Sequence, residues 1–266
     1  MFKGKTPLVY RVNDDPPLKG DPHYLLFRTS YGLVTATARR AENTIIIYPE
    51  IKDYLVQRKV AAQKLRLIPD GIDTNVFKPQ PQDKGDYGLF VGFLARRKGV
   101  DNLLQAAAQL NDSVHLMIVG DGPDRSRLWA LTQSLGIADR VKFTGAITNP
   151  NHLAELYGTA RFFCLPALSE CGIPLVILEA MACGAPIIAS KLSAIPSVVQ
   201  DGYNGFLVEP SDIDRLAQKM QILASSPELS KEMGERSVAM LKEERSFTAM
   251  AKSIYQLYEE IVGDKR

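Results

Sequence analysis

The segment YGLFVGFLARRKGVDNLLQAAAQLNDSVHLMIVG, residues 87–120, decides the fold class of this 266-residue chain. Its apolar run at 87–94 is typical of a strand, and apolar residues recur at helical spacing over 99–110. The apolar face of that helix is expected to carry Leu103, Leu104, Ala107 and Leu110. A second apolar run at 114–120 lacks polar alternation, as expected for a parallel strand covered on both faces. A strand, a helix and a strand in this order predict a doubly wound, parallel α/β sheet.

Strands and helices continue to alternate on both sides of this segment. Toward the C-terminus we predict strands at 141–145, 161–166, 186–190 and 205–210, and helices at 124–136, 151–158, 227–243 and 246–262. We predict two further helices, one that begins at Pro174 and one that follows Ser211 as its N-cap. Toward the N-terminus we predict strands at 7–12 and 43–48 and helices at 24–41 and 50–59. The same α/β class is therefore expected for both ends of the chain.

The chain is expected to divide into three parts. Residues 1–79 would form a partial α/β segment, 80–244 a Rossmann-like domain, and 245–266 the final helix. The stretch KPQPQDKGD at 78–86 is rich in Pro, Gln, Asp, Lys and Gly, which favours a linker. A complete doubly wound domain needs roughly 100–150 residues, so the N-terminal portion is predicted to be truncated.

Composition and charge limit the class of protein. Hydrophobic residues make up 45% of the chain and charged residues 23%, which excludes disordered and fibrous classes. The net charge of +2 fits an anionic ligand, while the one short basic run at 96–98 argues against a nucleic-acid partner.

The chain has three cysteines, Cys164, Cys171 and Cys183, and three scattered histidines, so we expect a reducing compartment and neither disulfides nor a metal site. We find no signal peptide and no apolar stretch of ~18 residues, and we expect a cytoplasmic protein.

A basic loop after the first strand of the opening segment is a candidate phosphate site. Arg96, Arg97 and Lys98 follow the strand, and ligands of open α/β sheets bind beyond the carboxyl ends of strands. Arginine and lysine there can bind phosphate through charge-assisted hydrogen bonds. The alternative interpretation is a solvated basic loop.

The segment SECGIPLVILEAMACG, residues 169–184, is a second candidate. Gly172 permits a tight turn and Pro174 begins a helix, whose first amides and dipole form an anion site. Glu170 before the helix and Glu179 inside it could hold sugar hydroxyls on either side of the phosphates. A nucleoside diphosphate sugar has this order of groups. Ordinary solvated charges are the alternative for both glutamates.

Six segments occur in the order seen in one enzyme family. They are IPDGIDTNVFKP, VGFLARRKG, IVGDGP, VKFTG, CLPALSECGIPLVILEAMACGAPIIAS and DGYNGFLVEPSD. Over residues 65–262 the chain resembles the retaining GT-B glycosyltransferases of family 4, the glycosyl transferases group 1. The resemblance implies a GT-B fold whose C-terminal Rossmann-like domain binds a nucleotide sugar. It also implies sugar transfer to an acceptor hydroxyl with retention and without a metal or other cofactor.

The resemblance assigns roles to single residues. Glu170 would contact the transferred sugar, Glu179 would hold the ribose hydroxyls, and Lys98 would bind the diphosphate. The phosphates would also contact the helix-start segment of Gly172, Ile173 and Pro174. The base would lie beside Gly145 and Ala146. The predicted donor site also includes Gly92, Arg96 and Asn13.

Three features depart from the family pattern. Glu170 and Glu179 are nine residues apart, where the family has eight. Phe93 stands where an arginine would share the diphosphate with Lys98. Arg96 or Arg97 is expected to compensate for it, with Arg96 preferred. Asn13 stands where many members carry a histidine that reaches the sugar, and the strands that would precede it build most of the acceptor cleft.

In the family the final helix crosses back onto the N-terminal domain. Because that domain is predicted to be truncated here, some apolar residues of the helix should be partly uncovered, and a partner chain or a second copy would cover them. These residues are Ile254, Leu257, Tyr258 and Ile261.

The leading hypothesis is a glycosyltransferase that uses a UDP-, GDP- or ADP-linked sugar. One alternative is a non-catalytic or incomplete nucleotide-sugar-binding subunit that needs a partner chain. Others are a split enzyme completed by a second chain and a nucleotide-sugar epimerase of the same superfamily. The acceptor is left open between a polysaccharide, a lipid and a small molecule, and peripheral membrane contact, common in the family, is left open as well.

Overall fold

The computed structural model describes residues 8–12, 24–80, 84–111, 114–241 and 245–263, with the backbone alone over 24–30. The chain divides into two compact units. The smaller unit consists of Met1–Gly71 and Glu243–Arg266, and the larger one of Ile72–Lys242. The sequence predicts these boundaries at 79/80 and 244/245.

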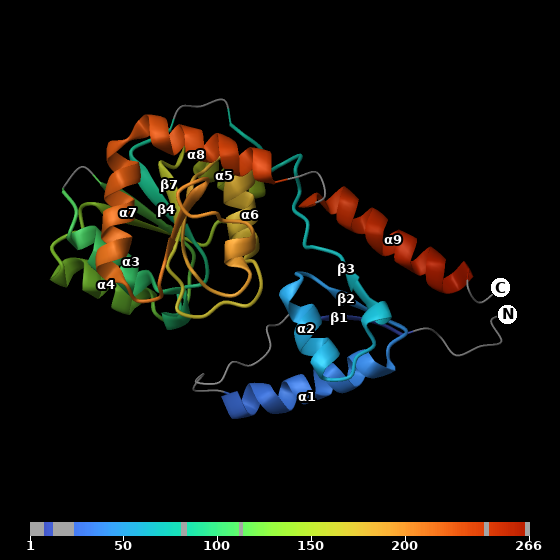
Figure 1. The fold of residues 1–266 in the computed structure, drawn as a ribbon. Helices are drawn as coiled ribbons and strands as arrows, with labels where there is room; N and C mark the ends of the chain where they lie inside the picture. The colour runs from blue at the N-terminus through green and yellow to red at the C-terminus, as the bar shows by residue number, and fades with distance from the viewer. Residues whose placement is uncertain (1–7, 13–23, 81–83, 112–113, 242–244, 264–266) are drawn as a thin grey trace. The chain divides into compact units, whose positions relative to one another are not determined.

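The larger unit is built on a parallel sheet (Figure 1). In the described residues it has six strands, in the order β6-β5-β4-β7-β8-β9, and all paired neighbours are parallel. The strands are β4 (Tyr87–Val91), β5 (His115–Val119), β6 (Val141–Gly145), β7 (Phe162–Leu165), β8 (Ile187–Ser190) and β9 (Gly205–Val208). The predicted doubly wound topology is confirmed, and the order of the strands reverses between β4 and β7.

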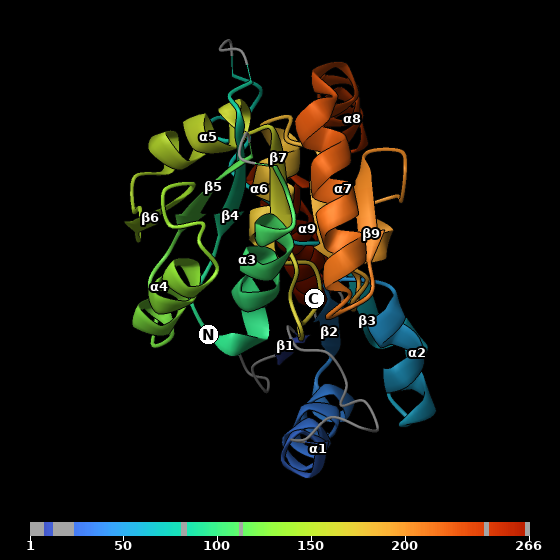
Figure 2. The ribbon, with the colours of Figure 1, turned by 90° about the vertical axis from the view of Figure 1, so that its left-hand side faces the viewer.

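Helices cover both faces of this sheet, as Figures 1 and 2 show. One face carries α3 (Val100–Ala108), α4 (Arg125–Ser134) and α7 (Ile213–Ser225); the other carries α5 (Pro150–Thr159) and α6 (Leu175–Ala182); and α8 (Pro227–Met240) contacts both α6 and α7. Leu103, Leu104 and Ala107 of α3 are buried, which confirms the predicted apolar face. Since both faces are covered, the central strands β7 and β8 are buried at every residue, whereas the edge strand β6 exposes Lys142.

The start of α7 differs from the prediction by one residue. The N-cap is Asp212, whose side chain accepts a hydrogen bond from the Arg215 amide at 2.9 Å. Ser211, the predicted N-cap, has a φ of 67° and belongs to the turn before the helix. A carboxylate is a strong acceptor at the positive end of a helix, so Asp212 takes the capping position.

The smaller unit contains a second parallel sheet. Its described residues form three strands in the order β1-β2-β3. The elements are β1 (Val9–Val12), α1 (Tyr24–Arg40), β2 (Asn43–Ile46), α2 (Glu50–Gln57), the 3₁₀ turn η1 (Ala62–Lys64), β3 (Leu65–Leu67) and α9 (Phe247–Gly263). The sequence did not predict β3, because three residues are too few to show a period. Its pairing with β2, at Thr44↔Leu65 and Ile46↔Leu67, defines it.

The final helix α9 is covered more completely than predicted. Leu257 and Ile261 are only 3% and 6% exposed, and they pack with Ile45 and Ile68 in one core cluster. The expectation that these two side chains are uncovered is therefore wrong, because the three-stranded sheet already offers an apolar face to the helix. Tyr258, in contrast, is 49% exposed.

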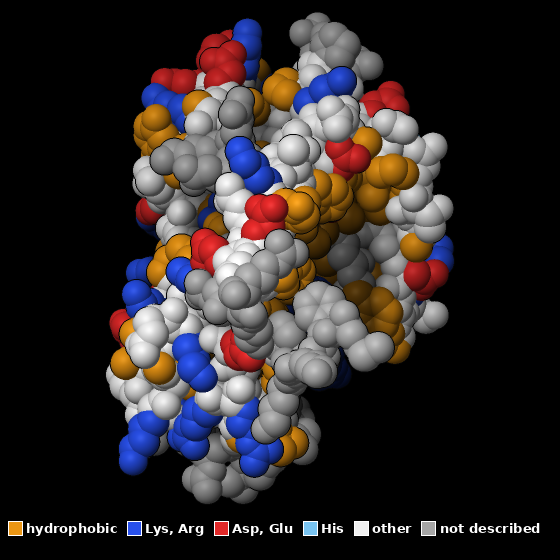
Figure 3. Space-filling model, turned by 90° about the vertical axis from the view of Figure 1, so that its right-hand side faces the viewer, with side chains coloured by type: hydrophobic (Ala, Val, Ile, Leu, Met, Phe, Trp, Pro, Cys, Tyr) orange, Lys and Arg blue, Asp and Glu red, His pale blue; other side chains and the backbone are white. Residues whose placement is uncertain are grey.

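Basic side chains gather on the smaller unit at the C-terminal ends of α1 and α2, and Lys and Arg side chains are prominent in the lower part of Figure 3. Arg39 Nε donates to the Arg58 carbonyl oxygen at 2.8 Å, and Lys64 Nζ donates to the carbonyl oxygen of Ala41 at 2.8 Å. These cations satisfy backbone acceptors where the helices end. Within the described ranges, none of the helices combines the length and apolarity needed to cross a bilayer.

Candidate functional site

The candidate site lies where the strand order of the larger unit reverses. Because all its strands are parallel, the loops that follow them gather at one edge. The chain runs from β4 to β5 and β6 on one side, and from β7 to β8 and β9 on the other. Such a switch point leaves a crevice at the carboxyl ends of the strands, where ligands of open α/β sheets bind. The two loops at this point are residues 92–99 after β4 and 166–174 after β7.

Gly99 brings these two loops together. Its φ of 69° is left-handed, and a Cβ built on it would lie 1.8 Å from the Pro166 carbonyl oxygen. The amides of Leu168 and Ser169 donate to the Arg97 carbonyl oxygen, at 2.8 and 3.4 Å. Only glycine combines this backbone conformation with so close an approach. The loop after β7 therefore lies directly against the loop after β4.

An ion pair between Lys98 and Glu170 joins the two loops. Lys98 Nζ contacts Glu170 Oε1, and the two side chains are only 12% and 6% exposed. Arg97 Nη1 lies 3.8 Å from the other carboxylate oxygen, with its own side chain 55% exposed. Two cations thus face one carboxylate, in surroundings that screen charge less than water does. The sequence predicted both Lys98 and Glu170 as site residues, and the structure brings them into contact.

Arg96 and Phe93 lie on the exposed side of the same loop. Phe93 is 56% exposed, and the Arg96 side chain also faces solvent. Arg96 is one of several groups that lower the pKa of the Asp101 carboxyl, after the larger effects of Arg127. Its role in place of the missing arginine stays a prediction.

The predicted helix-start segment leads into α6. Gly172 has a φ of 63°, Ile173 is 8% exposed, and Pro174 immediately precedes the first helical residue, Leu175. The turn at Gly172 thus connects Glu170 to the N-terminus of a helix whose first amides have no partner within the helix. The structure places the N-terminal end of α6 shortly after Glu170 in the chain.

The other predicted donor residues lie at the ends of β4 and β6. Gly92 follows β4, and its amide donates to the Val119 carbonyl oxygen at 3.0 Å. Gly145 ends β6 with a φ of 77°, and Ala146 after it is exposed. Asn13 lies outside the described residues, so its role stays a prediction.

Glu179 is held by the neighbouring helix α5. Tyr157 Oη donates to Glu179 Oε2 at 3.0 Å. Burial raises the pKa of Glu179, and the hydrogen bond from Tyr157 opposes that rise. Burial, together with the charge of Glu179, holds the pKa of the Tyr157 hydroxyl well above its ordinary value. Tyr157 was not predicted as a site residue, because a tyrosine at a buried helical position is typical of a core residue.

The raised pKa of Glu179 predicts a pH-dependent stability. A carboxyl whose pKa is higher in the folded than in the unfolded state stabilises the fold below about pH 4, its ordinary range. This contribution is lost as the pH rises through the raised pKa. Glu179→Gln should therefore gain stability relative to the wild type between about pH 4 and pH 7. Urea denaturation at several pH values measures this difference, and a wild type that gains on the variant as the pH rises would contradict it.

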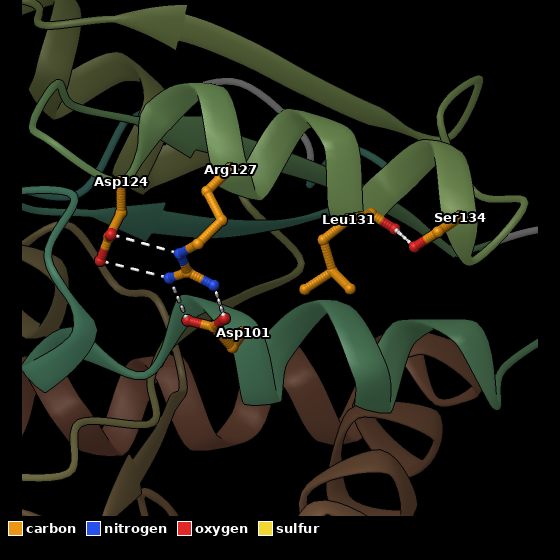
Figure 4. A network of polar contacts seen from close by, with 5 residues as sticks. All are labelled: Asp101, Asp124, Arg127, Leu131 and Ser134. Atoms are coloured by element: carbon orange, nitrogen blue, oxygen red, sulfur yellow. Dashed lines mark hydrogen bonds and ion pairs between the residues drawn. The ribbon is translucent and has the colours of Figure 1, made fainter.

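Arg127 of α4 links Asp101 at the start of α3 to Asp124 just before α4 (Figure 4). Its guanidinium binds both carboxylate oxygens of Asp101, with Nη2 2.9 Å from Oδ2, and its Nε lies 3.2 Å from Asp124 Oδ1. The hydrogen bonds from Arg127 lower the pKa of the Asp101 carboxyl. Asp101 stands in the first turn of α3, three residues after Lys98. The sequence analysis missed this network, because nothing local in the sequence pairs α3 with α4.

A pocket of about 320 Å³ lies away from this edge, near the C-terminal end of α6. It is lined by Pro79, Gln80, Lys84, Gly158, Cys183, Gly184, Lys231, Glu235 and Val238. Burial lowers the pKa of Lys84 to about 8 and raises that of Cys183 to about 12. None of the predicted donor residues lines this pocket. In the part of the chain that the structure describes, no three His, Cys, Asp or Glu side chains gather as metal ligands would.

Comparison with known proteins identifies the family. The profile of the family described as "Glycosyl transferases group 1" matches residues 71–240. The chain belongs to this family. It is similar to MMP alpha-(1->4)-mannosyltransferase of Mycolicibacterium hassiacum, with 31% identity over 246 residues. That alignment covers 90% of this chain and 59% of the relative.

Solved structures confirm the predicted GT-B fold of this group 1 chain. Sucrose-phosphate synthase from Thermosynechococcus elongatus is 28% identical, with a TM-score of 0.83 over 96% of this chain and 68% of its own. The Anabaena protein HepE, solved in complex with UDP and glucose, shares the fold at 22% identity and a TM-score of 0.82, over 95% of this chain and 71% of its own. The chain spans about half the length of the curated relatives it matches, 59%, 49% and 43% for three of them.

Proposed function

We propose that this chain carries the donor site of a retaining, metal-independent transfer of a sugar from a nucleotide-diphosphate sugar to an acceptor hydroxyl. The observation that carries the proposal is the buried contact of Lys98 with Glu170 at the switch point of a group 1 glycosyltransferase fold. With Arg97 at 3.8 Å from Glu170, this edge has two cations for one carboxylate, which favours an anionic ligand.

The diphosphate would lie between Lys98 and the N-terminus of α6. Lys98 already contacts one anion, Glu170, and it has three donor hydrogens, so it can contact a phosphate oxygen as well. The amides at the start of α6 and the positive end of its dipole would bind the other oxygens. These groups supply the positive charge that a metal ion supplies in other phosphate sites, which supports metal independence.

The proposed chemistry is a substitution at the anomeric carbon of the sugar. The bond from this carbon to the diphosphate oxygen breaks, and the diphosphate keeps the electron pair. The acceptor oxygen forms the new bond on the face that the diphosphate leaves, and its proton passes to a diphosphate oxygen. Lys98 would stabilise the developing negative charge, while Glu170 would accept hydrogen bonds from the sugar and hold it for attack.

A second candidate function is binding of a nucleotide sugar without transfer, in an assembly completed by a partner chain. Phe93 favours this candidate, because an exposed aromatic ring occupies a position where the family carries a cation for the diphosphate. Glu179 also favours this candidate, because its Oε2 already accepts a hydrogen bond from Tyr157. Binding without turnover distinguishes this candidate from the first.

Thermal denaturation of the chain with UDP, GDP, ADP and their glucose and mannose conjugates tests both candidates. A nucleotide that raises the melting temperature is then assayed for release of sugar from its conjugate. Glu170→Gln should reduce this release about 100-fold, because the sugar loses its positioning contact, while the control Glu155→Gln on α5 should leave it unchanged. Stabilisation without release would favour the binding subunit, and no stabilisation by any nucleotide would contradict both candidates.

A further inference from the structure

The loop after β5 and the first turn of α4 carry a pair of polar side chains that the proposed function has not used. Neighbouring strands lie about 4.8 Å apart, so the end of β6 is about 10 Å from the end of β4. A nucleoside attached to a diphosphate at Lys98 would extend over this distance if it lies toward β6. The side chains it would meet there are Asp121, in the loop after β5, and Arg125, the first residue of α4.

Arg125 and Asp121 form a fixed ion pair. Arg125 Nη1 donates to Asp121 Oδ2 at 3.1 Å, and the Gly122 amide donates to Asp121 Oδ1 at 2.8 Å. The Asp121 carbonyl oxygen also accepts from the Leu94 amide at 2.9 Å, which ties this loop to the one after β4. The backbone therefore positions Asp121, and Asp121 positions Arg125.

The guanidinium of Arg125 lies beside Gly145, whose backbone is buried. Its Nη1 would lie 3.7 Å from a Cβ built on Gly145. Apart from the immediate chain neighbours, this is the one heavy atom of the described residues within 4 Å of that position. The Arg125 and Asp121 side chains are 46% and 54% exposed, so a ligand can reach both. A base whose edge reaches this turn would meet the exposed guanidinium of Arg125 and the carboxylate of Asp121.

We propose that Arg125 selects a nucleobase that carries a carbonyl group, uracil or guanine, over adenine; this inference rests on the proposed donor site. A guanidinium only donates hydrogen bonds, so it favours the carbonyl oxygen of uracil or guanine. Adenine has an amino group at the corresponding position, and two donors would then face each other. Asp121 accepts beside Arg125, which matches the ring N–H next to the carbonyl in uracil and guanine.

Calorimetric titration of UDP, GDP and ADP tests this selection. The wild type should bind UDP or GDP at least about tenfold more tightly than ADP, because a hydrogen bond to a charged group discriminates by about this factor. Arg125→Ala should weaken binding of the preferred nucleotide about tenfold and that of ADP less than about threefold. The control is Lys191→Ala. Lys191 is an exposed cation that follows β8, on the opposite side of the switch point, and it pairs with Glu209 at 3.8 Å.

Each result has a distinct meaning. An equal loss for all three nucleotides in Arg125→Ala would overturn the proposal, since Arg125 would then act on the diphosphate. Equal or tighter binding of ADP by the wild type would overturn it as well. If the wild type binds none of the three, the proposed function itself fails. Arg125→Lys keeps the charge with a different donor geometry, and it should retain diphosphate affinity while losing part of the preference for a carbonyl base.

Discussion

Lys98→Met should destabilise the larger unit by about 3–5 kcal/mol, the range seen when one partner of a buried ion pair is removed. The Glu170 side chain is only 6% exposed, and Lys98 is its close cation. Arg97, at 3.8 Å and 55% exposed, would compensate for the lost charge only in part. Urea denaturation, followed by fluorescence of Trp129 in the same unit, measures the change in the free energy of unfolding.

Two comparisons make this prediction specific. Lys142→Met removes an exposed lysine from β6 and should change stability by no more than about 0.5 kcal/mol. The double variant Lys98→Met/Glu170→Met replaces both charges by apolar groups, and it should recover most of the lost stability, as replacement of a whole buried pair often does. If Lys98→Met costs no more than Lys142→Met, then the pair is not the buried contact described here.

Gly99→Ala should strongly disturb the two loops of the site. A left-handed φ costs a residue with a Cβ about 1–2 kcal/mol. The Cβ would also lie 1.8 Å from the Pro166 carbonyl oxygen, so the loop after β4 or the loop after β7 must move. We expect a total loss of at least about 3 kcal/mol, measured by urea denaturation, since strain and displacement add. Nucleotide binding should be lost as well, because Lys98 precedes Gly99.

Gly136→Ala is the matched control for Gly99→Ala. Gly136 has the same φ of 69°, but apart from its chain neighbours no heavy atom of the described residues lies within 4 Å of a Cβ built on it. It should therefore show the cost of the backbone conformation alone, about 1–2 kcal/mol, with nucleotide binding unchanged. Equal losses in the two variants would mean that the contact with Pro166 does not hold the loops together.

The fold could be predicted from the sequence wherever an element depends on its own residues. The strand at 141–145 was predicted with the bounds that β6 has, because its alternation of apolar and polar residues is a local signal. The predicted face of α3 is buried for the same reason. The strand β3 and the cover on α9 could not be predicted, because both depend on which surfaces meet. Pairing with β2 defines β3, and Ile45 and Ile68 cover Leu257.

The candidate site was predicted as residues but not as contacts. Lys98 and Glu170 stand out in the sequence as charged residues in loops after strands, and the family resemblance singles out both. Their contact spans 72 residues and depends on the approach of Gly99 to Pro166, which no local pattern contains. Tyr157 and Arg127 were missed for the same reason, since each bonds to a partner on another helix.

The central claim is that Lys98 and the start of α6 bind a diphosphate. Calorimetric titration with a nucleoside diphosphate and with its parent nucleoside tests it most directly, in the wild type, in Lys142→Met and in Lys98→Met/Glu170→Met. We predict that the wild type and Lys142→Met bind the nucleoside diphosphate about 100-fold more tightly than the nucleoside, since several charge-assisted hydrogen bonds contribute. In the double variant this ratio of affinities should be less than about tenfold. An unchanged preference for the diphosphate in the double variant would contradict the claim.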